Sequence, residues 1–155
     1  MLKKIFWLFL ILMVVDMAVI FMFSSQNAEK SSQVSKGIVE TVVEKIIEKV
    51  DKTNKIEVKP EILEKIIRKS AHFTLFALLG VFAFLMLKTS GCIRKNMYIF
   101  AFTLLICIVY AISDEVHQLF VSGRDGNVAD VVIDTSGALI GMSIAYLLSR
   151  VRFSK

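Results

Sequence analysis

Cysteine and proline are scarce in this chain, which has two cysteines and one proline among its 155 residues. Cys92 falls between two apolar runs and Cys107 falls within one, so the two thiols should lie apart. We therefore expect no disulfide and no cysteine-based metal site, and we interpret both as small packing residues. No internal repeat is evident, and we treat residues 1–155 as a single domain.

Charge is also sparse, since charged residues make up 21% of the chain, hydrophobic residues 55%, and the mean hydropathy is +0.66. A soluble domain of this length would bury its core under a charged surface. Here the apolar residues gather in runs, each near the ~20 residues that cross a bilayer. The sequence predicts an all-α integral membrane protein with four transmembrane helices, at residues 5–23, 70–87, 97–120 and 130–149.

The first apolar run resembles a signal peptide in one respect, because Lys3 and Lys4 precede it. Its apolar stretch is too long for that role, and no clean cleavage site between small residues follows it. We expect this run to remain as a membrane anchor.

Acids are absent from three basic segments that flank the apolar runs. The positive-inside rule places these segments in the cytoplasm, with both termini inside and residues 24–69 and 121–129 outside. The net charge of +5 then comes from basic residues that fix the orientation of the helices in the membrane, and we expect no nucleic-acid partner. Other cations, mostly interleaved with acids, flank the proposed outer side, so the opposite orientation is the alternative. The three basic segments contain Lys3 and Lys4; Lys88, Arg94 and Lys95; and Arg150, Arg152 and Lys155.

The segment between the first two runs is expected to be helical and extracytoplasmic. Residues 24–35 are polar and rich in serine, which favours turns and helix starts. Apolar residues within 34–50 recur at helical spacing, so this stretch predicts an amphipathic helix on the membrane surface or on the outer ends of the bundle. Pro60 is well placed to open a second short helix, at 61–69, that leads into the second membrane helix.

Two glycines, Gly137 and Gly141, form a GxxxG pattern in the fourth run. Small residues let membrane helices approach closely. We interpret the pattern as packing within the bundle, and homodimerisation is the alternative.

Ionisable residues at the ends of three apolar runs should share one depth. Asp114 lies about 17 residues, roughly 26 Å, along the third helix from Met97, which places it in the outer leaflet or headgroup zone. His72 and Asp134 each lie about one turn inside their own helices. Charged groups beside hydrocarbon are costly, so they are functional candidates by default.

Helical spacing predicts which of these groups share a face. Each of the three helices carries a pair or trio of polar residues three or four positions apart, and packing these faces together would keep charge away from lipid. Arg124 lies in a glycine-containing loop and could reach over the cluster to bind a carboxylate or phosphate. The catalytic candidates are His72, Asp114 and Glu115, and the binding candidates are Lys69, His117, Gln118, Arg124, Asp130 and Asp134.

A simpler structural role is the alternative for most of these residues. Lys69 and Arg124 could extend to lipid headgroups, and Asp130 could cap a helix N-terminus. His117 could pack at a helix interface, and the simpler account of His72 and Asp114 is a hydrogen-bonded pair. Asp16, near the middle of the first run, is interpreted as a structural or partly protonated acid.

Acids outnumber cations in the predicted cluster. Lys69 and Arg124 face five carboxylates, so either some carboxyl groups share protons or a cation is bound. No recognised metal-binding spacing is present, and we expect no cofactor, with a divalent cation held by carboxylates and histidine as the alternative. The five acids are Asp114, Glu115, Asp125, Asp130 and Asp134.

At these residues the sequence resembles the VanZ family of small bacterial membrane proteins. The resemblance runs through FSSQNAEKSS at 23–32, IRKSAHFTLFALLG at 67–80 and the block at 112–141. Ser122 stands where the family often has proline, which affects only the loop turn. The family pattern falls on Lys69, His72, Asp114, Glu115, Gln118, Gly123, Arg124 and Asp130.

The resemblance implies a bacterial cell-envelope setting and, in the member that gave the family its name, low-level resistance to teicoplanin-type glycopeptides. It suggests action at the outer leaflet on a lipid-linked envelope precursor or a glycopeptide drug. A non-catalytic protein that binds and shields such a molecule is the alternative, and a small transporter is a further one.

Overall fold

The computed structural model describes residues 2–26, 60–122, 124 and 126–153. Its elements are the helices α1 (Leu2–Ser24), α3 (Pro60–Ser90), α4 (Asn96–Gln118) and α5 (Val128–Phe153). The expected amphipathic stretch at 34–50 lies outside the described residues, as do Gly123 and Asp125. The prediction of an all-α protein with four long apolar helices is confirmed.

All four helices are long and apolar enough to cross a membrane. Their spanning portions contain 22 to 26 residues, with mean hydropathy between 1.7 and 2.7. At ~1.5 Å of rise per residue this exceeds the ~30 Å hydrocarbon core of a bilayer. Large apolar side chains that a water-soluble protein would bury are exposed along the bundle, among them Trp7, Phe21, Phe102, Val109 and Leu148. The chain is therefore a multi-pass membrane protein.

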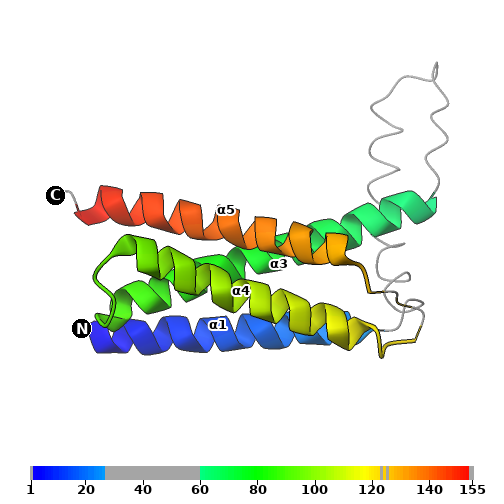
Figure 1. The fold of residues 1–155 in the computed structure, drawn as a ribbon, viewed down its shortest axis with the longest axis horizontal. Helices are drawn as coiled ribbons and strands as arrows, with labels where there is room; N and C mark the ends of the chain where they lie inside the picture. The colour runs from blue at the N-terminus through cyan, green and yellow to red at the C-terminus, as the bar shows by residue number, and fades with distance from the viewer. Residues whose placement is uncertain (1, 27–59, 123, 125, 154–155) are drawn as a thin grey trace, which may run out of the picture.

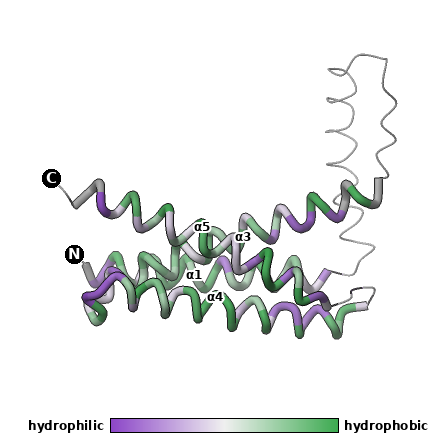
Figure 2. Tube along the Cα trace, turned by 45° about the horizontal axis from the view of Figure 1, so that its top comes forward, coloured by the Kyte–Doolittle hydropathy of each residue, from purple (hydrophilic) through white to green (hydrophobic). Residues whose placement is uncertain are grey.

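The helices run alongside one another, with α3 packed mainly against α5 and α1 (Figure 1). α1 begins and α5 ends at the same end of the bundle, as four crossings require. Hydrophobic residues occupy the middle of the helices, and hydrophilic ones gather toward their ends (Figure 2). The first turns of α3 project past the other helices at the opposite end from the termini.

The helix boundaries differ from the predicted ones, since α1 and α5 extend beyond the predicted 5–23 and 130–149, and α3 and α4 differ as well. α3 is one continuous helix from Pro60, so the short helix expected at 61–69 and the membrane helix expected at 70–87 are a single element. Proline suits its first position because the missing N–H would be unsatisfied there anyway. α4 ends at Gln118 instead of residue 120, where Leu119 forms its C-cap.

Glycines allow α3 and α5 to pack backbone against backbone. A Cβ added at Gly141 would lie 1.9 Å from the carbonyl oxygen of Ala77, and one at Gly137 would lie 2.4 Å from that of Phe73. Gly80 of α3 meets the Ala138 carbonyl of α5 in the same way. The interpretation of the GxxxG pattern as packing within the bundle is confirmed.

An apolar core lies below the polar end of the bundle. Ile20, Phe76, Leu79 and Cys107 are fully buried in it, one from α1, two from α3 and one from α4. Phe76 is one helical turn from His72, so apolar side chains fill the space directly beneath the polar residues. Cys107 and the exposed Cys92 are both free thiols, as expected.

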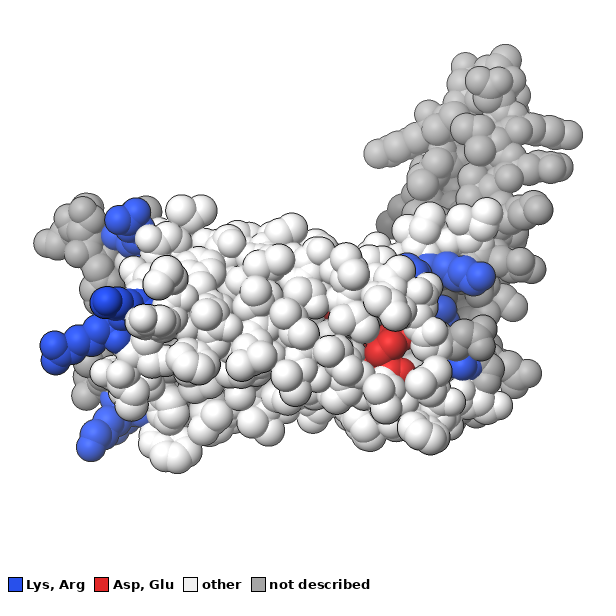
Figure 3. All heavy atoms as spheres, viewed as in Figure 1, with Lys and Arg blue, Asp and Glu red and all other residues white. Residues whose placement is uncertain are grey.

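Charge is distributed unevenly along the bundle. Basic side chains gather at the end that carries both termini, and the acidic side chains visible on this face lie toward the other end, beside basic ones (Figure 3). Among the described residues, every acid belongs to that other half, with Asp16 nearest to the middle of the bundle. This pattern agrees with the positive-inside argument, while the orientation itself stays a prediction.

Candidate functional site

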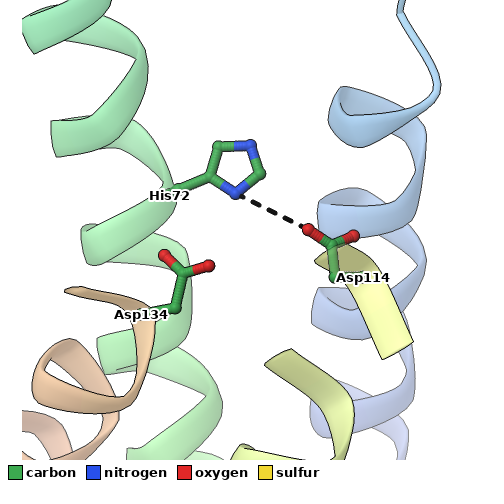
Figure 4. A group of neighbouring side chains, drawn as sticks. All are labelled: His72, Asp114 and Asp134. Carbon is green, nitrogen blue, oxygen red and sulfur yellow. Dashed lines mark ion pairs between the residues drawn. The ribbon is translucent and has the colours of Figure 1, made fainter. Parts of the chain in front are cut away.

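Three side chains from three helices converge at the end opposite the termini. His72 of α3, Asp114 of α4 and Asp134 of α5 each offer a donor atom, and these atoms all lie within 4.8 Å of one another. Figure 4 shows the three side chains pointing toward a common space. We call them the triad. The structure thus brings together residues that spacing alone placed at one depth on separate helices.

Asp114 is held by three neighbours, all at one of its two oxygens. Its Oδ2 accepts hydrogen bonds from Ser24 Oγ at 2.8 Å and from Gln118 Nε2 at 2.9 Å, and it lies 3.9 Å from His72 Nδ1. Its Oδ1 is buried and has no hydrogen-bond partner among the described residues. One carboxylate oxygen is therefore fixed, and the other remains available.

Asp134 is the second buried acid of the triad. Only 3% of its surface is exposed, the same fraction as for Asp114. Within the described part of the chain, no lysine or arginine lies within ion-pair distance of either acid. Two buried carboxylates, those of Asp114 and Asp134, therefore lie close to each other and to one imidazole, that of His72.

Glu115 faces the loop between α4 and α5. Its Oε1 accepts a hydrogen bond from the backbone N–H of Asn127. Asn127 Oδ1 in turn accepts a hydrogen bond from the Ala129 N–H at 3.0 Å, which caps the start of α5. Glu115 thus anchors the loop, and it is not part of the triad.

Lys69 and Asp130 form an ion pair that joins α3 to α5. Both side chains are partly exposed, at 38% and 29%. The helix-capping alternative for Asp130 is wrong, because Asp130 lies inside the first turn of α5 and Asn127 supplies the cap. An acid in a first turn is still favourable because it faces the positive end of the helix dipole.

Arg124 extends from the loop to the end of α1. Its Nη2 donates a hydrogen bond to the Phe23 carbonyl at 3.0 Å, and its Nε is buried with no partner among the described residues. Burial lowers the pKa of Arg124, and the positive charge of Arg68 lowers this pKa further, while Asp114 and Glu115 raise it. A guanidinium remains protonated through such shifts. Arg124 is therefore a charged donor with hydrogen-bonding capacity to spare.

The end of α1 also belongs to the site, which sequence reasoning missed. Besides the Ser24 hydrogen bond to Asp114, Ser25 Oγ lies 3.1 Å from His117 Nε2. Phe21 stacks on the His117 ring with centroids 4.4 Å apart. Four helices therefore build the site, where three were expected. The sequence signal for this part of the site was the pair Ser24 and Ser25 in the block FSSQNAEKSS at 23–32, although serines at that place predict only a turn.

Arg68 is a second residue that sequence reasoning left out of the site. It precedes His72 by four positions, so both lie on one face of α3. Its charge interacts with that of Arg124. The i,i+4 spacing to His72 would have identified it, as the i,i+3 spacing identified Lys69.

The remaining predicted residues lie around the triad. Gln118 contacts Asp114 directly, and His117 turns toward α1, in agreement with its interface alternative. Asp16 is buried lower in α1, about 12 Å along the helix from Ser24, and its Oδ2 has no partner among the described residues. Asp16 therefore lies apart from the cluster.

A comparison with protein families finds that the model of the VanZ/LLP1 family matches residues 6–149. The chain belongs to the VanZ/LLP1 family. The match extends over all four helices of this VanZ/LLP1 protein. No curated protein and no solved structure matches the chain. Lys69, His72, Asp114 and Arg124, four of the residues on which the family pattern falls, lie at one end of the bundle.

Proposed function

We propose that this VanZ/LLP1 protein acts at the outer leaflet of a bacterial membrane on an amphiphilic, phosphate-bearing envelope molecule, and that this action gives resistance to teicoplanin-type glycopeptides. The observation that carries the proposal is the buried Nε of Arg124, which has no partner in the described part of the chain and lies beside a cluster of acids and histidine. A buried donor without an acceptor is costly, and an anionic ligand would satisfy it.

Two further cations would assist Arg124 in holding a phosphate. Arg68 has no carboxylate within ion-pair distance among the described residues, and Lys69 could exchange Asp130 for the ligand. Guanidinium groups match phosphate oxygens with paired hydrogen bonds, while an ammonium acts as a point charge. Arg124, Arg68 and Lys69 would therefore bring three positive groups to a phosphate headgroup.

An apolar groove would hold the hydrocarbon part of such a ligand. It lies between α1 and α4, has a volume of about 290 Å³, and is lined by Met17, Leu105, Ile106, Val109, Tyr110 and Ser113. Ser113 immediately precedes Asp114, so the groove leads toward the polar end. A molecule with a phosphate head and an acyl or prenyl tail would fit both features.

In a catalytic form of this proposal, Asp114 is the favoured general base and His72 its acid–base partner. The atoms His72 Nδ1 and Asp114 Oδ2 are 3.9 Å apart, close to hydrogen-bond range. Glu115 is the weaker candidate for the base because it already accepts a hydrogen bond from Asn127. Arg124 and Lys69 would stabilise the negative charge of the reacting group.

Single substitutions test the proposal in cells. Arg124→Ala, His72→Ala and Glu115→Ala would each be expressed in a susceptible Gram-positive host beside wild type, and teicoplanin susceptibility measured at equal protein levels. Lys95→Ala is the control because Lys95 is an exposed cation at the opposite end. We expect Arg124→Ala to abolish protection, Glu115→Ala to reduce it less than His72→Ala, and Lys95→Ala to retain it.

Unchanged susceptibility in all three site variants would contradict the proposal. Mass spectrometry of envelope precursors then distinguishes the two modes of action. Altered precursors indicate a reaction, whereas a protein that only binds and shields its ligand leaves them chemically unchanged.

A further inference from the structure

We infer that the triad of His72, Asp114 and Asp134 is a binding site for one divalent transition-metal cation of the Zn²⁺ class. The inference does not depend on the proposed phosphate-bearing ligand, but it replaces the catalytic form in which Asp114 and His72 act as base and acid, because both would then be metal ligands. It stands on the convergence of the three donors and on a buried carboxylate oxygen, Asp114 Oδ1, that has no partner among the described residues.

The donors approach the geometry of a metal site with three protein ligands. Zn²⁺ binds imidazole nitrogen and carboxylate oxygen at ~2.0–2.2 Å, which puts neighbouring ligand atoms ~3.3 Å apart in a tetrahedron. The three donor atoms already lie within 4.8 Å of one another. Small side-chain rotations would draw them to this spacing, because Figure 4 shows all three directed at the same space. The fourth position would be open to water or another ligand.

Asp114 is oriented as metal-binding carboxylates usually are. Ser24 and Gln118 both donate hydrogen bonds to its Oδ2, which fixes the plane of the carboxylate. The oxygen that faces His72 in Figure 4 is Oδ2, which lies 3.9 Å from Nδ1, so Oδ2 is the first ligand atom and the buried Oδ1 would complete a bidentate carboxylate. Hydrogen bonds from outer neighbours that orient a ligating group are a regular feature of metal sites.

Charge balance also favours a cation in the triad. Asp114 and Asp134 are both 3% exposed, and burying two carboxylates together with one histidine is costly. Among the described residues no lysine or arginine lies within ion-pair distance of either acid, and Lys69 pairs with Asp130 instead. A divalent ion would neutralise both carboxylates, with His72 binding as neutral imidazole.

The donor set selects the class of metal. One imidazole nitrogen with two carboxylates suits Zn²⁺, Mn²⁺ or Fe²⁺. Ca²⁺ takes six to eight oxygen ligands, and Mg²⁺ prefers an octahedron of oxygens. Three buried side chains that include a histidine are therefore poorly suited to either hard cation.

Zinc binding to the purified full chain tests the inference. A Cys92→Ser background removes the exposed thiol, a purification tag without histidine is used, and Zn²⁺ content is measured by equilibrium dialysis in detergent. We expect one Zn²⁺ per wild-type chain, not displaced by Ca²⁺ or Mg²⁺. Asp134→Asn and His72→Gln should each weaken binding by at least about tenfold.

Two matched controls use residues at the same end of the bundle but outside the triad. Asp130→Asn removes an acid and His117→Gln removes a histidine, and both should retain the full equivalent of Zn²⁺. No saturable binding by wild type, or an undiminished equivalent in both triad variants, would overturn the inference. If the triad variants fail to fold, X-ray absorption of zinc-loaded wild type decides. One imidazole nitrogen with oxygens supports the site, and a shell without imidazole contradicts it.

Discussion

Asp114 illustrates how a carboxylate is kept buried near the polar end of a membrane helix. It is 3% exposed, yet its Oδ2 accepts two hydrogen bonds, one from its own helix at Gln118 and one from α1 at Ser24. The Ser24 hydroxyl is fully buried in this contact. The hydrogen bond therefore both orients the acid and fastens α1 to α4.

Replacing Ser24 by alanine should destabilise the protein by about 0.5–1.5 kcal/mol, because a buried acceptor loses one of its donors. The midpoint of thermal unfolding in detergent micelles measures the effect. Ser143→Ala is the control, since Ser143 is exposed and donates to the Leu139 carbonyl of its own helix, α5. Equal or greater destabilisation by Ser143→Ala would show that the Ser24 contact is not the cause.

The residues of the site were only partly predictable from the sequence. His72, Asp114 and Asp134 were identified because an ionisable group inside an apolar run is conspicuous wherever it occurs. Ser24 was not, because serine is unremarkable at a helix end and its partner lies 90 positions away in the chain. Contacts across such distances depend on how the helices are rotated against one another, which local periodicity does not specify.

At the level of elements, the close contact between α3 and α5 positions two members of the triad. His72 lies one residue before Phe73, whose carbonyl approaches Gly137, and Asp134 lies three residues before Gly137. Glycine is required here because any side chain would meet backbone atoms.

The four helices were predictable from hydropathy alone, whereas their extents were not, because polar residues such as Lys65 and Lys69 continue α3 beyond its apolar run.

Gly141→Ala should destabilise the bundle by about 1–3 kcal/mol, because the new Cβ would lie 1.9 Å from the Ala77 carbonyl oxygen and force the helices apart. Thermal unfolding in micelles again measures the change. Ser143→Ala on the same helix is the control, since Ser143 is exposed and donates a hydrogen bond to the Leu139 carbonyl of its own helix. A Gly141→Ala protein as stable as the Ser143→Ala protein would contradict this packing.

At the level of the whole molecule, the bundle has two chemically different ends. One carries both termini and basic residues such as Arg94 and Lys95, and the other carries the triad with its surrounding cations. The apolar core between them separates the two ends, with Phe76 and Phe84 fully buried along α3. The proposed function requires the triad end to face outward, where envelope precursors and glycopeptides are accessible.

Cysteine labelling in intact bacteria tests that requirement most directly. Native Cys92 is exposed in the loop at the terminal end, and Ser122→Cys in a Cys92→Ser background places one exposed thiol at the triad end. Buried Cys107 is retained in both proteins. With a membrane-impermeant thiol reagent, we predict that the Ser122→Cys protein is labelled in intact cells and that native Cys92 is labelled only after lysis. Labelling of Cys92 in intact cells, with the Ser122→Cys protein protected until lysis, would contradict the outward-facing site.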